Sequence, residues 1–128
     1  SLTYSWPEAL KKAEAADKIL RKRLDNLGLK FDEVHTEFIG YNACHGPLAK
    51  SLPEGDINEV MLRVAVRGQD YNSVERFGKE IAPLILTGPP AVTGFAGGRP
   101  KPSDVVAYWP ALIPKKLVTP EVKIMEMN

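Results

Sequence analysis

The run Asn58-Glu-Val-Met-Leu-Arg-Val-Ala-Val-Arg67 alternates between two kinds of side chain. Its even positions from Val60 to Val66 are all aliphatic, whereas its odd positions include Arg63 and Arg67. A period of two places successive side chains on opposite faces of a strand. We therefore predict a strand over 58–67 with one face in the core and the other partly exposed to water.

A second helix is predicted after this strand. Asp70 or Asn72 suits the N-cap, and Asn72 with Glu75 has the spacing of a capping box. An apolar face then continues to about residue 85, and Pro83 is expected to kink the helix or begin its end. The run Asp104–Trp109 predicts a third strand, and Glu121–Met127 predicts a short fourth one.

Upstream of 58–67, the pattern Ser5-Trp-Pro-Glu8 resembles a capping box with proline in the first turn. Apolar residues follow at helical spacing as far as Leu27, and Gly28 suits the C-cap, so we predict a helix over 6–27. Its charged face mixes acids with bases and is expected to be solvated. The segment 29–40 predicts the strand that precedes 58–67.

The predicted order is thus helix, strand, strand, helix, strand, strand. Strand 58–67, helix 72–85 and strand 104–109 would form a right-handed crossover whose two strands run parallel. The simplest architecture is an α+β two-layer sandwich, in which a mixed four-stranded sheet carries both helices on one face. We expect a single domain over 3–128. Because the chain begins Ser1-Leu2 without methionine, we expect it to be a piece of a longer protein.

Composition excludes some functions. Apolar residues make up 44% and charged residues 26% of the 128 residues, and 17 basic against 16 acidic side chains leave a net charge of +1. This balance gives no electrostatic reason to expect nucleic acid or a membrane as partner. No apolar run approaches the roughly 20 residues of a membrane span. The single cysteine, Cys44, cannot form an internal disulfide, which favours a cytoplasmic location.

The segment 87–102 contains four of the ten glycines and four of the eleven prolines, which indicates an ordered loop of unusual backbone shape. Its glycines resemble phosphate-binding loops, but they follow a helix and lead into a strand, the reverse of the required order. A looser anion site built from Gly97, Gly98, Arg99 and Lys101 is one hypothesis. The alternative is a structural loop that covers the sheet end or meets a neighbouring chain.

The pair Cys44-His45 suggests a nucleophile or a metal site, but adjacent residues rarely point at one another. A zinc site needs three or four ligands, and the only other histidine is His35, inside a predicted strand. We therefore predict no metal and no catalytic residue here. Cys44 is expected to be a small buried hydrophobe, and His45 is added to the ligand-binding candidates as the polar tip of a pocket.

Two other groups favour structural roles. Asp32, Glu33 and Glu37 lie along one strand and are expected to form a solvated face. Trp109, at an aromatic strand end, is expected to pack in the core, with an interface anchor as the alternative.

Four stretches together resemble a known family: Arg63–Arg67, Val74–Leu84, Thr87–Pro100 and Tyr108–Pro114. They are similar to the later part of the acyclic terpene utilisation AtuA-like family, most specifically from about 60 to 118. The resemblance implies a bacterial, cytoplasmic protein several times longer than this chain, associated with the breakdown of branched terpenoid acids as coenzyme A thioesters. It supplies no functional residues. Only Gly97, Gly98, Arg99 and Pro100 match its motif.

Two functional hypotheses follow. In the first, the chain belongs to a protein that binds or acts on an acyl or carboxylate metabolite, with the loop 87–102 shaping the pocket. In the second, it is a structural or oligomerisation domain that packs against the remainder of the full-length protein or a twin subunit. The chain has no complete catalytic constellation, so we expect no cofactor and no enzyme activity of its own.

Overall fold

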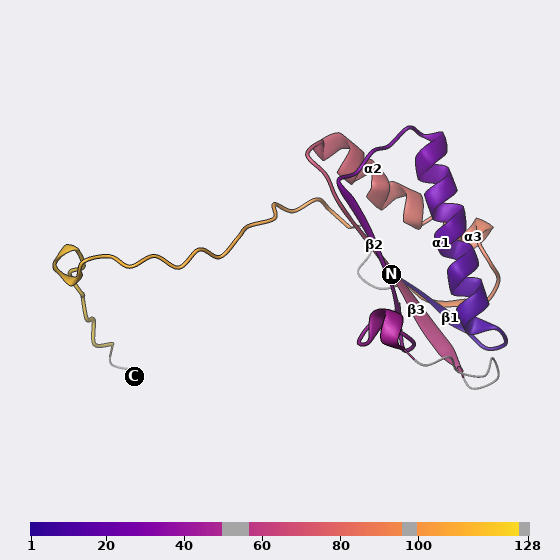
Figure 1. Ribbon diagram of the computed structural model, residues 1–128, viewed down its shortest axis with the longest axis horizontal. Coiled ribbons are helices and arrows are strands. Elements are labelled where there is room, and N and C mark those ends of the chain that lie inside the picture. Colours follow the sequence, from indigo (N-terminus) through magenta and orange to yellow (C-terminus); the bar gives the residue numbers. More distant parts are fainter. Residues whose placement is uncertain (50–56, 96–99, 126–128) are drawn as a thin grey trace.

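The structure is a computed structural model that describes residues 1–49, 57–95 and 100–125 (Figure 1). Two short 3-10 turns, η1 and η3, cover Gly46–Leu48 and Lys115–Leu117. The strands and α-helices are, in chain order, β1 Leu2–Ser5, α1 Ala9–Asn26, β2 Glu33–Ile39, β3 Glu59–Arg67, α2 Tyr71–Ile81, α3 Leu84–Thr87 and β4 Val92–Phe95.

The four strands form one sheet in the order β2-β3-β1-β4, and all three hydrogen-bonded pairs are antiparallel. β3 and β4 run in the same direction, but β1 lies between them. This is the split β-α-β arrangement. The strands β1 and β2 are separated by β3, and the strands β3 and β4 are separated by β1. Helices α1 and α2 contact each other and lie on the same side of the sheet (Figure 1).

The predicted α+β class is confirmed, with a four-stranded sheet and both helices on one face. The predicted order of elements was wrong at both ends. Strand β1 precedes the first helix, and β4 lies inside the glycine–proline segment that we expected to be a loop. The segments 104–109 and 121–125 form no strand, and the last residues of the predicted fourth strand lie outside the described residues. Both segments have strand-like sequences, but neither pairs with a strand of the described chain.

The core lies between the sheet and α1. In the register of β1 on β3, Leu2 stands opposite Leu62 and Tyr4 opposite Val60, and all four side chains are buried. The face of α1 that covers them has alanine at three successive buried positions. These small side chains leave room for the Tyr4 ring, which is completely buried. The core comprises Leu2, Tyr4, Ala9, Ala13, Ala16, Leu20, Leu24, Ile57, Val60, Leu62, Phe77, Ile81 and Leu84.

The start of α1 differs from the prediction. Ser5 belongs to β1, so it does not cap the helix, and the predicted capping box is wrong. Glu8 is the N-cap, in the left-handed conformation and without a side-chain capping bond. Trp6, which we placed on the buried stripe, is 62% exposed. Residues 2–5 form a strand because pairing with β3 and β4 gives hydrogen bonds to more backbone N–H and C=O groups than one helix cap would.

The predicted end of α1 and the predicted cap Asp70 of α2 are confirmed, whereas the capping box of Asn72 with Glu75 was wrong, because Asn72 lies inside α2. Gly28 has φ 67°, and the N–H of Leu29 donates to the Leu24 carbonyl at 3.1 Å, as in a Schellman ending. Asp70 caps α2 by accepting from the N–H groups of Asn72 and Ser73. Hydrogen bonds from Ser73, the hydroxyl foremost, hold the pKa of the Asp70 carboxyl below its usual value. The helix ends at Ile81, just before Pro83, and α3 follows.

A buried carboxylate ties the two helices together. Glu80 of α2 is 4% exposed and accepts from Arg23 of α1 at 2.7 Å, and it pairs with Arg76 at 2.8 Å. Burial would raise the pKa of Glu80, but the hydrogen bonds and charges of the two arginines outweigh it and lower the pKa. The carboxylate is therefore ionised and paired at neutral pH.

We expect Glu80→Gln to lower the free energy of unfolding by about 1–2 kcal/mol at pH 7, since the charged acceptor of two partly exposed arginines is lost. The pKa of Glu80 is lower in the folded chain than in the unfolded one. The stabilisation is thus present above the ordinary glutamate value and is lost as the pH falls through the folded value. Urea unfolding at a series of pH values measures this. The exposed Glu75, paired with Lys79 at 3.1 Å, is the matched control, and Glu75→Gln should change stability by less than about 0.5 kcal/mol. An equal loss for both variants would contradict this role of Glu80.

The hydroxyl of Tyr4 is buried without a hydrogen-bond partner among the described residues, and burial raises its pKa to about 12. A buried unsatisfied hydroxyl costs roughly 1–3 kcal/mol. We expect Tyr4→Phe to leave the melting temperature unchanged or to raise it, whereas Tyr4→Ala should lower stability by about 3–5 kcal/mol through the cavity. A clear loss of stability in Tyr4→Phe, measured by calorimetry, would show that the hydroxyl has a partner.

Candidate functional site

The sheet face opposite the helices carries mainly charged side chains. Glu37 of β2 pairs with Arg63, its register partner on β3, and also with His35 at 3.3 Å, while Arg67 pairs with Glu33 at 3.4 Å. The hydrogen bond from His35, together with Arg63, holds the pKa of Glu37 below its usual value. Of the three acids predicted to form a solvated face, Asp32 and Glu33 are exposed, although Asp32 precedes β2, whereas the side chain of Glu37 is only 17% exposed beneath its two partners.

Cys44 and His45 lie after β2, where η1 begins, and both are exposed. The prediction that Cys44 is buried was wrong, because the short turn stands on the surface beyond the end of the sheet. Within the ranges that the structure covers, no three residues of the metal-ligating types are grouped so that they could hold an ion.

The ligand-binding candidates are only partly within the described residues. Gly97, Gly98 and Arg99 lie outside them. Lys101 is exposed and lines two hollows beside α2, and His45 lines neither of these. That these five residues bind an anion together stays a prediction.

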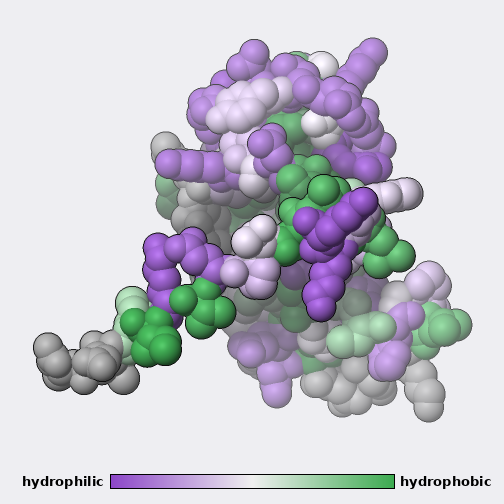
Figure 2. Space-filling model, turned by 90° about the vertical axis from the view of Figure 1, so that its left-hand side faces the viewer, coloured by the Kyte–Doolittle hydropathy of each residue, from purple (hydrophilic) through white to green (hydrophobic). Residues whose placement is uncertain are grey.

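The most conspicuous feature of the surface is the C-terminal segment 104–125, which we call the arm. Every residue of the arm is exposed, and Figure 1 shows it leaving the body on the side of the sheet away from α1. In Figure 2, where the arm points toward the viewer, green side chains near the end of the arm lie outside the outline of the body. Trp109 is 87% exposed, so the prediction that it packs in the core was wrong. The large apolar residues of the arm are Val105, Val106, Tyr108, Trp109, Leu112, Ile113, Leu117, Val118, Val122, Ile124 and Met125.

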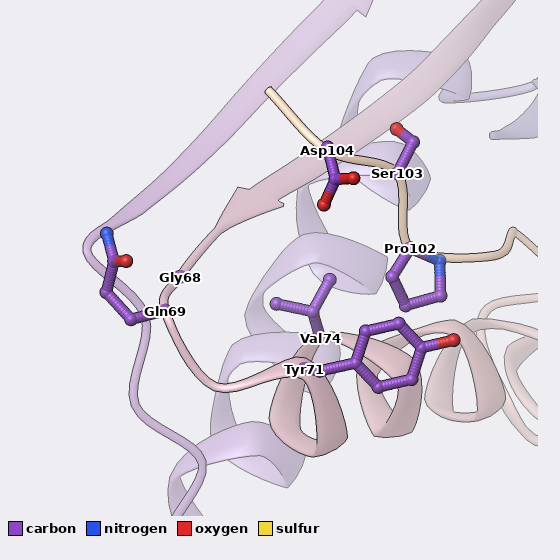
Figure 3. Close-up of a pocket in the computed structure, with 7 residues that line it drawn as sticks. All are labelled: Gly68, Gln69, Tyr71, Val74, Pro102, Ser103 and Asp104. Carbon is purple, nitrogen blue, oxygen red and sulfur yellow. The ribbon is translucent and has the colours of Figure 1, made fainter. Parts of the chain in front are cut away.

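The residues just before the arm, from Pro100 to Ser103, pack against α2. A Cβ added to Gly78 would stand only 2.6 Å from the carbonyl oxygen of Pro100, so the backbone approaches the helix as closely as a glycine allows. Tyr71 and Val74 project from α2 toward the Pro102 ring, beside a hollow of about 290 Å³ (Figure 3). The base of the arm is therefore placed by contacts, although the arm beyond it is exposed.

A larger hollow of about 410 Å³ lies between β3 and α2, and we call it the β3 groove. β3 contributes residues 63–66, and α2 contributes Val74, Phe77 and Ile81. Ser1, residues 100–103 and Val105 form the rim, which includes Lys101. The lining is mainly aliphatic and aromatic, with Arg63 and Lys101 as its charged residues, as is usual for a site that binds a partly apolar group.

Comparisons with known proteins place the chain in a family. A family model described as the acyclic terpene utilisation family protein AtuA matches residues 1–124. Neither the search of curated proteins nor the search of solved structures returned a match. Among the described helices, none combines the length and apolar character of a membrane span. Since the match covers almost the whole chain, this chain belongs to the acyclic terpene utilisation AtuA family.

Proposed function

We propose that this chain is an oligomerisation domain within a protein of acyclic terpene utilisation, and that its arm binds a second subunit. The single observation that supports the proposal is the arm, whose eleven large apolar side chains are each between 49% and 103% exposed. Soluble monomers rarely expose apolar patches beyond a few hundred Å². A surface of this kind is typical of a protein interface.

The size of the apolar surface supports an interface of ordinary dimensions. The eleven side chains together amount to about 1,000 Å², taking the areas usual for buried aromatic and aliphatic side chains. A stable interface buries about 800 Å² on each partner. The arm alone therefore carries enough apolar area for one side of a dimer.

The proposal predicts that the chain forms a dimer or a higher species at micromolar concentration. Tyr108 and Trp109 are the side chains most suited to be hot spots, because large aromatic residues dominate interface energies. Trp109→Ala should raise the dissociation constant at least about 30-fold, which corresponds to roughly 2 kcal/mol. Light scattering after gel filtration, over a range of concentrations, measures it.

Lys115 and Lys116 offer a matched control, since they lie on the same arm and are also exposed. The double change Lys115→Ser, Lys116→Ser should leave the dissociation constant within about threefold of the original, because rim charges contribute little to affinity. A chain that stays monomeric at every concentration would overturn the proposal.

Binding of an acyl or carboxylate metabolite is the second candidate. The observation that favours it is Lys101, a cation on the rim of the apolar β3 groove. A thermal-shift screen with coenzyme A thioesters and small carboxylic acids tests it. Ligand at 100 times its dissociation constant should stabilise the chain by about 2.7 kcal/mol, and Lys101→Ala should reduce the shift. The candidate fails if no compound raises the melting temperature.

A further inference from the structure

We propose that two copies of this chain associate through their arms, which pack side by side and antiparallel, with Asp104 of each arm beside Lys115 and Lys116 of the other. This inference rests on the proposed oligomerisation, and it names the arm of the second copy as the surface that each arm binds. It follows from the distribution of apolar side chains, from the charges at the two ends of the apolar run and from the space that the two bodies need.

A second arm is the surface that best complements the arm. Eighteen large apolar residues of the described chain are exposed, and eleven of them lie on the arm. The other seven lie on or near four separate elements, α1, η1, α2 and α3. Within the described part of the body, therefore, no element offers an exposed apolar surface as long as the arm. Another copy of the arm offers a surface of equal length.

Prolines keep the apolar run of the arm extended. The uncharged residues from Val105 to Pro114 follow Pro102 and include Pro110. Proline disrupts a helix and favours extended backbone at the residue before it, and Figure 1 shows this part of the arm leaving the body as an extended chain. Two such runs can bury their aliphatic and aromatic side chains against each other and leave no unpaired charge between them.

The charges at the two ends of the run favour the antiparallel direction. Asp104 precedes the run, and Lys115 and Lys116 follow it. All three side chains are exposed, and none forms an ion pair with another residue that the structure describes. Antiparallel arms bring one carboxylate beside two ammonium groups at each end, whereas parallel arms would place like charges together at both ends. Such charges contribute little affinity but select the orientation of an interface.

The space that the bodies need favours the same direction. Asp104 and Lys115 are eleven residues apart, which is roughly 35 Å of extended chain. Antiparallel arms separate the two bodies by about this distance, and a folded body of about 100 residues is about as wide. Parallel arms would begin side by side and force both bodies into the same space. A two-fold axis near Trp109 and Pro110 therefore relates the copies and closes the dimer.

Single cysteines distinguish the two directions in a chain whose native thiol is removed by Cys44→Ser. One chain carries Val106→Cys, and a second, tagged chain carries Ile113→Cys, at positions that antiparallel arms bring side by side. A short bis-maleimide links neighbouring thiols without the strict geometry of a disulfide. We expect the mixed pair to link at least tenfold more than Val106→Cys links to itself, because the two copies of residue 106 would be roughly 23 Å apart.

The outcomes separate this inference from the proposed oligomerisation. Self-linking of Val106→Cys that equals the mixed link would show parallel arms or arms without a fixed direction, contrary to the inference. An oligomer in which neither arm position links would show that the arm binds the body of the other copy, and it would leave the proposed oligomerisation standing. A chain that stays monomeric at every concentration would overturn both.

Charge reversal tests the ends of the run without added cysteines. Asp104→Lys in one variant, and Lys115→Asp with Lys116→Asp in another, would each place like charges together in the dimer of that variant. We expect each variant alone to raise the dissociation constant at least about fivefold, and the two mixed to form a dimer whose constant lies within about threefold of the original. Light scattering after gel filtration, with one variant tagged, measures both.

Asp25→Lys is the matched control, since it changes the net charge as much as Asp104→Lys but lies at the exposed end of α1. It should change the dissociation constant less than about twofold, because the charge is remote from the paired arms. Equal effects of Asp25→Lys and Asp104→Lys, or no preference for the mixed dimer, would overturn the antiparallel pairing of the arms.

Discussion

The register of β1 on β3 is the constraint on which the rest of the fold depends. It places Leu2 and Tyr4 beside Leu62 and Val60, directly beneath the alanine face of α1. β1 is also the only described strand that pairs with β4, so it connects β4 to the rest of the sheet. A slip of one residue would turn Leu2 and Tyr4 to the charged face and place Thr3 in the core.

The neighbours of β3 change along its length. Residues 59–62 pair with β1, whereas residues 63–66 line a hollow together with α2, the base of the arm and Ser1. Tight contact at Gly78 then directs the chain across α2 and out of the body. The base of the arm is therefore fixed to the folded body, while the apolar side chains of the arm stay exposed.

Much of the fold could be predicted from patterns with a clear period. The strand 58–67 and the helix after Asp70 were located within a few residues, because alternation over nine residues and a capped amphipathic face are strong signals. β1 and β4 were missed because four residues hardly establish a period, and Ser5 also fitted a helix cap. The run 104–109 has the pattern of a strand but no described partner. Such a pattern indicates that the segment suits burial against other apolar side chains, but it does not show whether the same chain or another one supplies them.

The candidate-site residues also divide into those that a clear period predicts and those that depend on tertiary contacts. The exposure of Glu33 and His35 followed from their positions on one face of an alternating strand, whereas the ion pairs that cover Glu37 depend on its neighbour β3. The exposure of Cys44 and Trp109 did not follow from the sequence, because it depends on which tertiary contacts form. The uncharged stretch between Asp104 and Lys115 was the available signal for an interface, and it resembled an ordinary core segment. The family match adds the context of acyclic terpene utilisation, and the arm supports a role in assembly.

Amide hydrogen exchange at two concentrations tests the central claim most directly. The backbone amides of the arm from Val105 to Val118 should exchange rapidly in dilute solution and become protected as the concentration rises, because the proposed interface would bury them. The residues of β1 should keep their protection throughout, since their ladder lies within one chain. If the arm exchanges equally rapidly at every concentration, then it does not bind a second subunit.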